Sequence, residues 1–382
     1  EKNYYDTQPI ISYVNNKPFC LVHNGNIKII EVFKRYHDIN SLNSETDTAI
    51  LSQYFVKELE RGYTVTDIIK NVIINIDGAY SIIIHYDNNV YAFRDSLGMR
   101  PLSYTIQEDM ICMSSESSVY KDINFNNEII EINPGEILKI NDKGIVSLGQ
   151  YRYHNRTVKQ ASCGLEYAYL SNDNSIFNNI LIKDARYNFG ISLWQEEEYQ
   201  EYIQNNYNDF VVSYIPNTAI YSAKGYSDAC GLDLVEVVGV NFKDRTFIIS
   251  NQEDRIKALL NKFTIKNVTN KRKLILIDDS IVRGNTLIII VFKLLMSNLF
   301  DEIYIRSASP PIRYEDYMGI DIPTRQELIA NYTINKKIYL YLSINNEKLK
   351  DTVILDRIIC NNKKYVIYLS KNSNEETIPI YT

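Results

Sequence analysis

The segment from Lys273 to Thr286 constrains the fold more than any other part of the chain. Its apolar run ends in two adjacent carboxylates, Asp278 and Asp279, and a turn with one glycine then leads into a second apolar stretch. This order predicts a buried strand, a loop and a helix. Because open α/β sheets bind ligands just beyond the carboxyl ends of their strands, we expect a ligand site here.

The composition of this loop suits a phosphorylated sugar. Backbone N–H groups in a loop that opens a helix can surround a phosphate, and the helix N-terminus adds partial positive charge. Paired acids accept hydrogen bonds from the hydroxyls of a ribose. Acid pairs at strand ends also commonly cap the next helix, and that alternative stays open at this point. The segment is neither a Walker loop nor a three-glycine dinucleotide fingerprint.

Length and charge bound the class of protein. The 382 residues suffice for two domains, and 45% hydrophobic and 23% charged residues are typical of an ordinary soluble protein. A net charge of −6, with acids and bases mixed, argues against nucleic acid as the main partner. No apolar run is long enough for a membrane span, so no membrane partner is expected.

The cysteines indicate a reduced compartment. Cys20, Cys112, Cys163, Cys230 and Cys360 are scattered and form no C-x-x-C pair. A disulfide framework or a structural zinc site is therefore not expected. A cytoplasmic location fits best.

Residues 1–155 predict an α+β layer structure. Short strands alternate with turns, among them a turn at Asn24–Asn26, and helical periodicity runs over Thr46–Leu59 and Thr66–Ile74. Many strands with one pair of helices favour an α+β domain.

Residues 156–382 predict a parallel sheet. Helices are expected over Asp184–Gln195 and Ala219–Cys230. They interleave with strands predicted at Phe210–Tyr214, Leu232–Val240, Leu274–Ile277 and Glu302–Ile305. The tail beyond Lys350 is polar and carries no clear pattern. We place the domain boundary at 155/156.

Eight short motifs point to one family. In chain order they are His23–Asn26, Arg94–Leu102, Pro134–Glu136, Glu166–Tyr167, Arg245–Ile248, Asp278–Gly284, Ser309–Ile312 and Gly319–Arg325. With these motifs the chain resembles the glutamine phosphoribosylpyrophosphate amidotransferases, also called amidophosphoribosyltransferases. The resemblance implies an incomplete N-terminal-nucleophile (Ntn) glutaminase sandwich in residues 1–155. A type I phosphoribosyltransferase domain, α/β with a parallel sheet, and a C-terminal tail then occupy residues 156–382.

The resemblance also implies a glycosyltransferase with two coupled reactions. The glutaminase part of the family releases ammonia from glutamine, and the transferase part adds it to phosphoribosyl pyrophosphate. The product is 5-phosphoribosylamine, and the reaction is the first committed step of de novo purine biosynthesis. Family members are commonly homo-oligomers inhibited by purine nucleotides, and we expect both here.

The transferase residues follow from the same resemblance. Asp278 and Asp279 hold the ribose hydroxyls and meet Mg²⁺ only indirectly, because the ion arrives with the substrate. The 5′-phosphate is held by the loop residues Ser280, Ile281, Val282, Arg283, Gly284, Asn285 and Thr286. Arg283 alternatively is a solvated charge.

The pyrophosphate side departs from the family pattern. Arg255 and Lys262 fall at family-like basic positions for pyrophosphate, although both also fit exposed charges on a helix or loop. A family aspartate is replaced by Asn217, and a family Asn-Arg pair by Val240–Asn241. A guanidinium that would grip a phosphate is thereby lost.

In the glutaminase half, the Asn24 side chain and the Gly25 N–H match the family's oxyanion hole, and Asp47 matches the acid that binds the glutamine α-amino group. Without the family, Asn-Gly is a hairpin signal and Asp47 a helix start. The family nucleophile is an N-terminal cysteine, whereas this sequence starts at Glu1, and Cys20 fits a buried structural role. The chain is then either a fragment, which its start inside the domain favours, or a protein without glutaminase chemistry. In both cases we expect it to use ammonia and not glutamine.

Other expectations follow from the same comparison. Only Cys163 and Cys360 approach the family's cluster ligands, so no iron–sulfur cluster is expected. A non-catalytic regulator that binds phosphoribosyl pyrophosphate or purine nucleotides is the first alternative function. A phosphoribosyltransferase for free bases is the second, and the retained His23–Asn26 motif argues against it.

Overall fold

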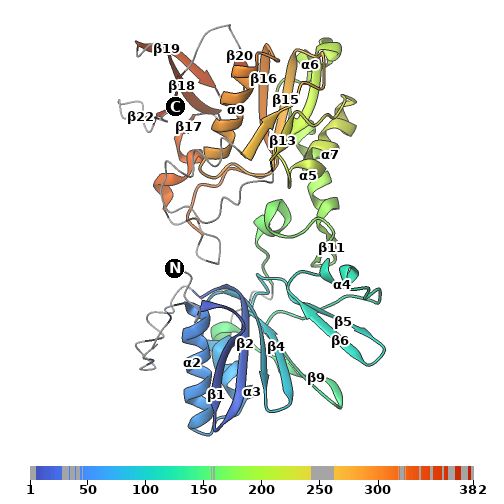
Figure 1. Cartoon of the computed structure of the whole chain (residues 1–382), viewed down its shortest axis with the longest axis vertical. Coiled ribbons are helices and arrows are strands. Elements are labelled where there is room, and N and C mark those ends of the chain that lie inside the picture. The colour runs from blue at the N-terminus through green and yellow to red at the C-terminus, as the bar shows by residue number, and fades with distance from the viewer. Residues whose placement is uncertain are drawn as a thin grey trace. The chain divides into compact units, whose positions relative to one another are not determined.

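The computed structural model describes residues 6–27, 34, 39, 44, 46–155, 157, 160–241, 262–316, 318, 322 and 324–334, with the backbone of further strands between 337 and 379. The chain divides into two compact units (Figure 1). Unit 1 comprises Glu1–Glu166, Asn174–Ile180 and Asp316–Pro323, and unit 2 comprises Tyr167–Asp173, Leu181–Glu315 and Thr324–Thr382.

Unit 1 is built on an antiparallel sheet with the strand order β1-β2-β3-β4-β8-β9. The strands are β1 (Ile10–Val14), β2 (Lys17–Asn26), β3 (Ala79–Tyr86), β4 (Asn89–Arg94), β8 (Glu136–Asn141) and β9 (Gly144–Gln150). The helices α2 (Asp47–Glu60) and α3 (Val65–Asn75) cover one face, and a common apolar core joins them to the sheet. Both predicted helices are confirmed. Each begins at a threonine, Thr46 or Thr64, whose hydroxyl accepts a backbone N–H of the first turn.

A second sheet packs on the face of the first sheet opposite to α2 and α3. Its order is β6-β5-β7, with β5 (Ser103–Gln107), β6 (Met110–Ser114) and β7 (Ile130–Glu131). A separate apolar core holds it, and Ala92, Leu102 and Leu138 are buried there. Unit 1 is completed by α4 (Val119–Asp122), the short 3₁₀ turn Tyr153–Asn155 and the short strand β10 (Ile176–Phe177).

The turn predicted at Asn24–Asn26 is wrong. Strand β2 continues through Asn26, and Gly25 pairs with Tyr80 of β3. The Asn-Gly pair is a local turn signal, but the antiparallel ladder with β3 extends the strand past it. Gly25 has φ +148°, and a Cβ there would collide with the carbonyl oxygen of Ala79. Glycine at this position therefore allows β2 and β3 to approach each other closely.

Unit 2 is built on a mixed sheet with the order β12-β15-β16-β20-β19-β18-β21-β22. Strands β12 (Phe210–Tyr214), β15 (Lys273–Asp278) and β16 (Glu302–Ser307) are parallel, as predicted. Antiparallel strands, which the sequence pattern did not predict, extend this core. They are β18 (Lys337–Ile344), β19 (Glu347–Ile354), β20 (Arg357–Ile359), β21 (Val366–Ser370) and β22 (Thr377–Pro379), with β17 (Thr333–Ile334) beside β18.

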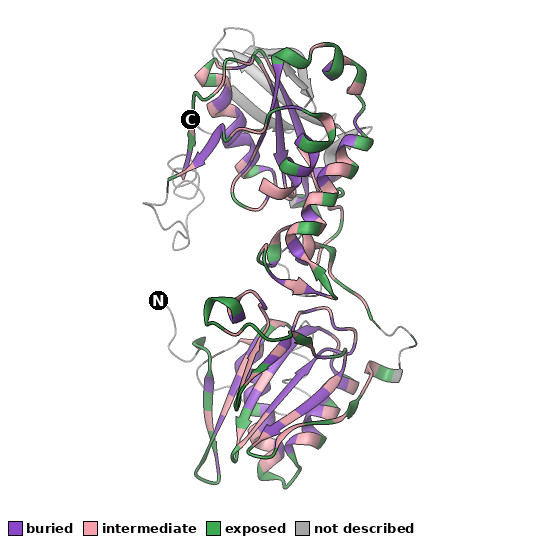
Figure 2. Cartoon of the chain, turned by 90° about the vertical axis from the view of Figure 1, so that its right-hand side faces the viewer, coloured by how far each residue is buried: buried purple, intermediate pink, exposed green. Residues whose placement is uncertain are grey.

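Helices cover both faces of the parallel strands. Leu274 and Leu276 pack on one face with α9 (Asn285–Ser297), and Ile275 and Ile277 pack on the other with α7 (Ile220–Cys230). Burial on both faces explains the continuous apolar run of β15, and Figure 2 shows the buried strands in purple.

The remaining elements of unit 2 flank this sheet. They are α5 (Ile182–Gln195), α6 (Gln200–Asn205), the 3₁₀ turns Tyr207–Asp209, Arg325–Glu327 and Ile329–Tyr332, and the antiparallel pair β13 (Val238–Val240) and β14 (Phe263–Ile265). A π-helical turn spans Glu166–Leu170, and β11 (Ile180–Leu181) pairs with β10. The strand predicted over Leu232–Val240 is thus shorter and antiparallel. No helix among the described residues is long and apolar enough to cross a membrane.

Candidate functional site

The acid pair lies where the three parallel strands end. Backbone hydrogen bonds tie the following loops together: Ile215 N–H donates to Ile277 O at 2.9 Å, Ala308 N–H to Asp278 O at 2.8 Å and Ser309 N–H to Asp279 O at 3.0 Å. Parallel strands bring their carboxyl ends to one edge of the sheet, which is where ligands bind in open α/β sheets. The structure therefore brings segments 215–218, 278–284 and 307–309 to one edge.

Asp278 is the last residue of β15 and is 8% exposed. Its Oδ1 accepts the N–H of Asp279 at 2.9 Å. Burial, and then the neighbouring Asp279 carboxylate, raise the pKa of Asp278 well above its ordinary range. A buried acceptor with so few donors around it is suited to a ligand that brings hydroxyl groups.

Asp279 is held by two hydroxyl groups. Thr218 Oγ1 is hydrogen-bonded to its Oδ2, and Ser280 Oγ donates to its Oδ1 at 2.7 Å. Burial raises the pKa of Asp279, while both hydroxyls and the charge of Arg186 act in the opposite direction. The two adjacent acids thus differ: one carboxylate is oriented by the protein, and the other is buried with fewer partners.

The loop opens α9 without a side-chain cap. Gly284 is the N-cap residue with φ +76°, and no side-chain cap bond is made there. A Cβ at Gly284 would lie 2.8 Å from Ile329 Cδ1. The alternative that the acid pair caps this helix is wrong, because Gly284 occupies the cap and the Asp279 oxygens have other partners. The first N–H groups of α9 therefore receive no hydrogen bond from a capping side chain and can bind an anion.

The other predicted loop residues line the same turn. Ile329 N–H donates to Val282 O at 3.0 Å, which anchors the middle of the loop. Ser280, Ile281, Val282, Arg283 and Thr286 are half-buried, Gly284 is buried and Asn285 is exposed.

The predicted pyrophosphate residues are placed only in part. Arg255 and the Arg245–Ile248 motif lie outside the described residues. Lys262 is half-buried, and its Nζ lies 5.2 Å from the centre of the Phe263 ring. Asn217 is exposed in the turn after β12.

The candidate oxyanion residues lie at the end of β2. Asn24 is exposed, and its Nδ2 donates to Ser115 Oγ at 2.9 Å. Asp47, the first residue of α2, is brought beside this strand end: its Oδ2 accepts the N–H of Ile27 at 3.0 Å, and its Oδ1 the N–H of Thr48 at 2.7 Å. The end of β2 and the start of α2 therefore come together, while the roles of Asn24, Gly25 and Asp47 stay predictions.

His23 is buried next to this strand end. Its Nδ1 lies 3.0 Å from Thr48 Oγ1, and its backbone is bracketed by Gln8, whose amide donates to His23 O at 3.0 Å and accepts from His23 N–H at 2.6 Å. Burial lowers the pKa of His23. Burial therefore favours the neutral form of the imidazole.

The Arg94–Leu102 motif, which the sequence showed only as a family marker, organises a loop. Arg94 is buried, and its guanidinium donates to Gly98 O, Arg100 O and Ile132 O at 2.6, 2.6 and 2.8 Å. The buried Asp95 carboxylate accepts N–H groups from the same loop and from Tyr80, the partner of Gly25.

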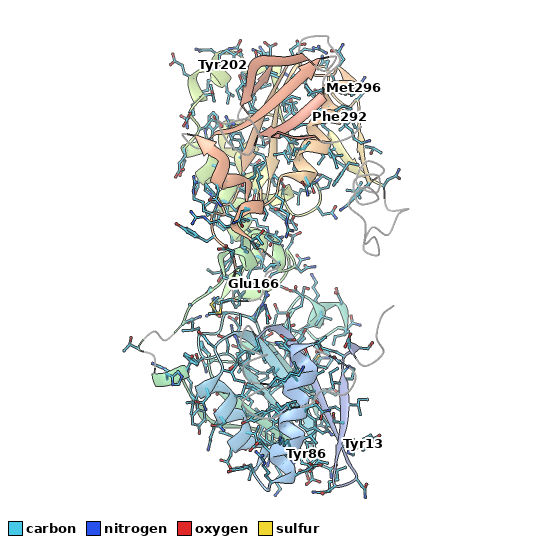
Figure 3. The ribbon with its side chains drawn as sticks, turned by 90° about the vertical axis from the view of Figure 1, so that its left-hand side faces the viewer. Tyr13, Tyr86, Glu166, Tyr202, Phe292 and Met296 are labelled. Carbon is cyan, nitrogen blue, oxygen red and sulfur yellow. The ribbon has the colours of Figure 1, made fainter. Side chains whose placement is uncertain are left out.

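Two further buried arginines make ion pairs with segments distant in sequence. Arg100 Nη1 lies 2.7 Å from Glu166 Oε1. Glu166 is labelled in Figure 3. Arg186 of α5 is 1% exposed, is paired with Asp173, and donates to Tyr167 O at 2.9 Å and Ser171 O at 2.8 Å. The sequence signal that could have singled out Arg186 is a basic residue on an otherwise largely buried face of a helix.

Cys163 and Cys360 are the two cysteines closest to the family's cluster ligands. Cys163 is half-buried, and burial raises the pKa of its thiol. The side chain of Cys360 lies outside the described part of the chain. Among the described residues no three His, Cys, Asp or Glu side chains gather as a metal site. The expectation about an iron–sulfur cluster stays a prediction.

Comparisons with known proteins agree with this geometry. A family described as a glutamine amidotransferase domain matches residues 2–121. The amidophosphoribosyltransferase of Pyrococcus horikoshii is 31% identical over 85% of this chain and 69% of its own length, and the human one 32% identical over 89% and 68%. The Bacillus subtilis glutamine phosphoribosylpyrophosphate amidotransferase, solved with ADP and GMP, superposes with a TM-score of 0.72 at 29% identity and covers 87% of this chain and 71% of its own. The chain therefore belongs to the amidophosphoribosyltransferase family.

Proposed function

We propose that this chain transfers the phosphoribosyl group of phosphoribosyl pyrophosphate to ammonia. The C–N bond forms at the ribosyl carbon as the bond to pyrophosphate breaks, and 5-phosphoribosylamine results. One observation carries the proposal: Asp278 and Asp279 end a parallel strand and lead into the uncapped N-terminus of α9, in a chain of this family. Residues 1–155 form the glutaminase part and residues 156–382 the transferase part.

The residues of this edge bind and orient the substrate. The carboxylates of Asp278 and Asp279 accept hydrogen bonds from the ribose hydroxyls. The N–H groups from Ser280 to Thr286, with the partial positive charge of the α9 N-terminus, hold the 5′-phosphate. The substrate is thereby fixed at both ends of its ribose, which leaves the ribosyl carbon open to ammonia.

Mg²⁺ enters as part of the substrate. The ion prefers oxygen ligands and is usually held by one or two carboxylates together with substrate phosphates. The carboxylates of Asp278 and Asp279 would meet the ion only indirectly, through the ribose hydroxyls of the substrate. The bound ion neutralises charge on the departing pyrophosphate.

The glutaminase part supplies recognition groups for glutamine. Asn24 Nδ2 and the Gly25 N–H act as oxyanion donors, and Asp47 accepts the α-ammonium group. The Bacillus subtilis relative was solved with ADP and GMP. We propose that purine nucleotides also bind this chain and inhibit it.

The test is pyrophosphate release from magnesium phosphoribosyl pyrophosphate, with ammonia and glutamine supplied in separate assays. Asp278→Asn and Asp279→Asn are expected to lower kcat/KM with ammonia by about 100-fold, since each loses charge-assisted hydrogen bonds of about 1.5–3 kcal/mol. Asp228→Asn, an exposed aspartate of α7, is the matched control and keeps full activity. Unchanged turnover in both acid-pair variants would refute the proposal.

A non-catalytic regulator is the second candidate. It is favoured by Asn217, which stands exposed where the family has an aspartate, and by Val240–Asn241 in place of an Asn-Arg pair. Calorimetric binding of magnesium phosphoribosyl pyrophosphate, without turnover by either nitrogen source, would support this candidate over the transferase.

A further inference from the structure

Asp279 is held by the loops after all three parallel strands. Thr218, after β12, is hydrogen-bonded to its Oδ2; Ser280, in its own loop, donates to its Oδ1 at 2.7 Å; and Ser309, after β16, donates its N–H to Asp279 O at 3.0 Å. Thr218 comes from a segment 61 residues earlier in the chain. This contact joins the turn after β12 to the loop after β15.

Thr218 is not used in the way its position suggests. A threonine just before a helix commonly accepts an N–H group of the first turn. Helix α7 has Ala219 as its N-cap residue and makes no side-chain cap bond. The hydroxyl of Thr218 turns to the Asp279 carboxylate instead.

Two hydroxyl contacts leave Asp279 able to bind a ligand. A carboxylate offers about four lone-pair sites on its two oxygens. Thr218 uses one site on Oδ2 and the Ser280 hydroxyl uses one on Oδ1, and the backbone N–H of Ser280 also donates to the carboxylate. These contacts fix the carboxylate plane. A carboxylate held in this plane can accept a hydrogen bond from a ribose hydroxyl.

We propose that Thr218 is a positioning residue that aligns the Asp279 carboxylate for the ribose of phosphoribosyl pyrophosphate. The inference rests on the function proposed above. It concerns the hydroxyl and not the fold of the turn, because Ile215 N–H to Ile277 O at 2.9 Å and the parallel register of β12 with β15 already hold this edge together. Removing the hydroxyl leaves the carboxylate held by Ser280 alone, so its orientation is less fixed while the sheet remains.

The experiment measures ammonia-dependent pyrophosphate release by the full 382-residue chain with magnesium phosphoribosyl pyrophosphate. Thr218→Val removes the hydroxyl at nearly constant volume, and Thr218→Ser retains it. Thr218→Val is expected to raise KM for phosphoribosyl pyrophosphate about tenfold, the low end of the effect of one hydrogen bond to a charged group. KM for ammonia stays unchanged. Thr218→Ser is expected to stay within about twofold of the unmodified chain.

Two reference variants separate the possible failures. Thr264→Val, an exposed threonine of β14, controls for the substitution itself and leaves KM unchanged. If Asp279→Asn impairs substrate use while Thr218→Val does not, the positioning role is refuted and the proposed function stands. Equal impairment in Thr218→Ser and Thr218→Val also refutes it, since volume and not the hydroxyl would then matter. If neither Asp279→Asn nor Asp278→Asn has an effect, the proposed function fails as well.

Discussion

Arg306 of β16 and Glu197, which follows α5, form a buried ion pair between the sheet and its helical cover. Arg306 Nη2 lies 2.7 Å from Glu197 Oε1, and the Tyr226 hydroxyl donates to the second oxygen at 2.7 Å. Burial acts to raise the pKa of Glu197, but the hydrogen bonds and charge of Arg306 outweigh it, so the pKa is lowered. A lowered carboxyl pKa stabilises the fold above the unfolded-state value and loses that contribution as pH falls.

Arg306→Met is therefore expected to reduce the free energy of unfolding by about 3 kcal/mol, because it leaves a buried carboxylate without its partner. Its stability is also expected to depend less on pH than that of the unmodified chain as the pH falls below 4.5, the ordinary Glu value. Urea unfolding at several pH values measures both effects. Lys17→Met, from the exposed Lys17–Asp87 pair, is the control and costs less than about 1 kcal/mol. Equal losses in the two variants would contradict the buried-pair argument.

At the scale of elements, two glycines set how closely α5 and α7 pack. A Cβ at Gly190 of α5 would collide with the Ser222 carbonyl oxygen, and one at Gly225 of α7 with the Tyr187 carbonyl oxygen. Both obstacles are backbone atoms of the facing helix, which cannot turn aside as a side chain can. A glycine inside a helix normally lowers stability, so the sequence alone reads these positions as weak points, whereas close packing requires them.

Gly225→Ala is expected to destabilise the chain by about 1–3 kcal/mol, the usual cost of overpacking, although alanine favours the helical state. Thermal or urea unfolding measures the change. Gly164→Ala has no neighbour within 4 Å of the added Cβ and serves as the matched control. A stabilised Gly225→Ala variant would show that helix propensity outweighs the close contact.

At the scale of the whole molecule, the two units have separate apolar cores. Val14, Phe55 and Ile82 belong to a core of unit 1, and Leu276 and Val291 to one of unit 2. Domains that each have their own apolar core fold as separate cooperative units.

Calorimetry is therefore expected to resolve two unfolding transitions. Magnesium phosphoribosyl pyrophosphate should raise the transition temperature of unit 2 only. At a free concentration 100 times Kd, the free energy of unfolding of that unit rises by about 2.7 kcal/mol. Asp279→Asn should abolish that shift and serves as the control. A single transition that moves as a whole would contradict independent units.

The local pattern was sufficient for part of the fold and site. The apolar run of β15, the two acids and the apolar face of α9 follow one another in sequence, so strand, loop and helix were predicted together, as were α2 and α3. The assignment of Asp278, Asp279 and the loop to a substrate stays a prediction, as do the oxyanion role of Asn24 and the boundary at 155/156.

The sequence by itself determined where chain segments are apolar, where acids end a strand, and which family motifs stand in order. The tertiary structure alone decided which distant groups meet. β2 runs through Asn24 and Gly25 because β3 pairs with it, and the Thr218 hydroxyl reaches Asp279 because β12 and β15 are neighbours in the sheet. Local preferences for helix or strand are worth a few tenths to about 1 kcal/mol per residue. Strand pairing and buried side-chain contacts between segments far apart in sequence outweigh them. A local sequence pattern does not show which distant segments will be partners.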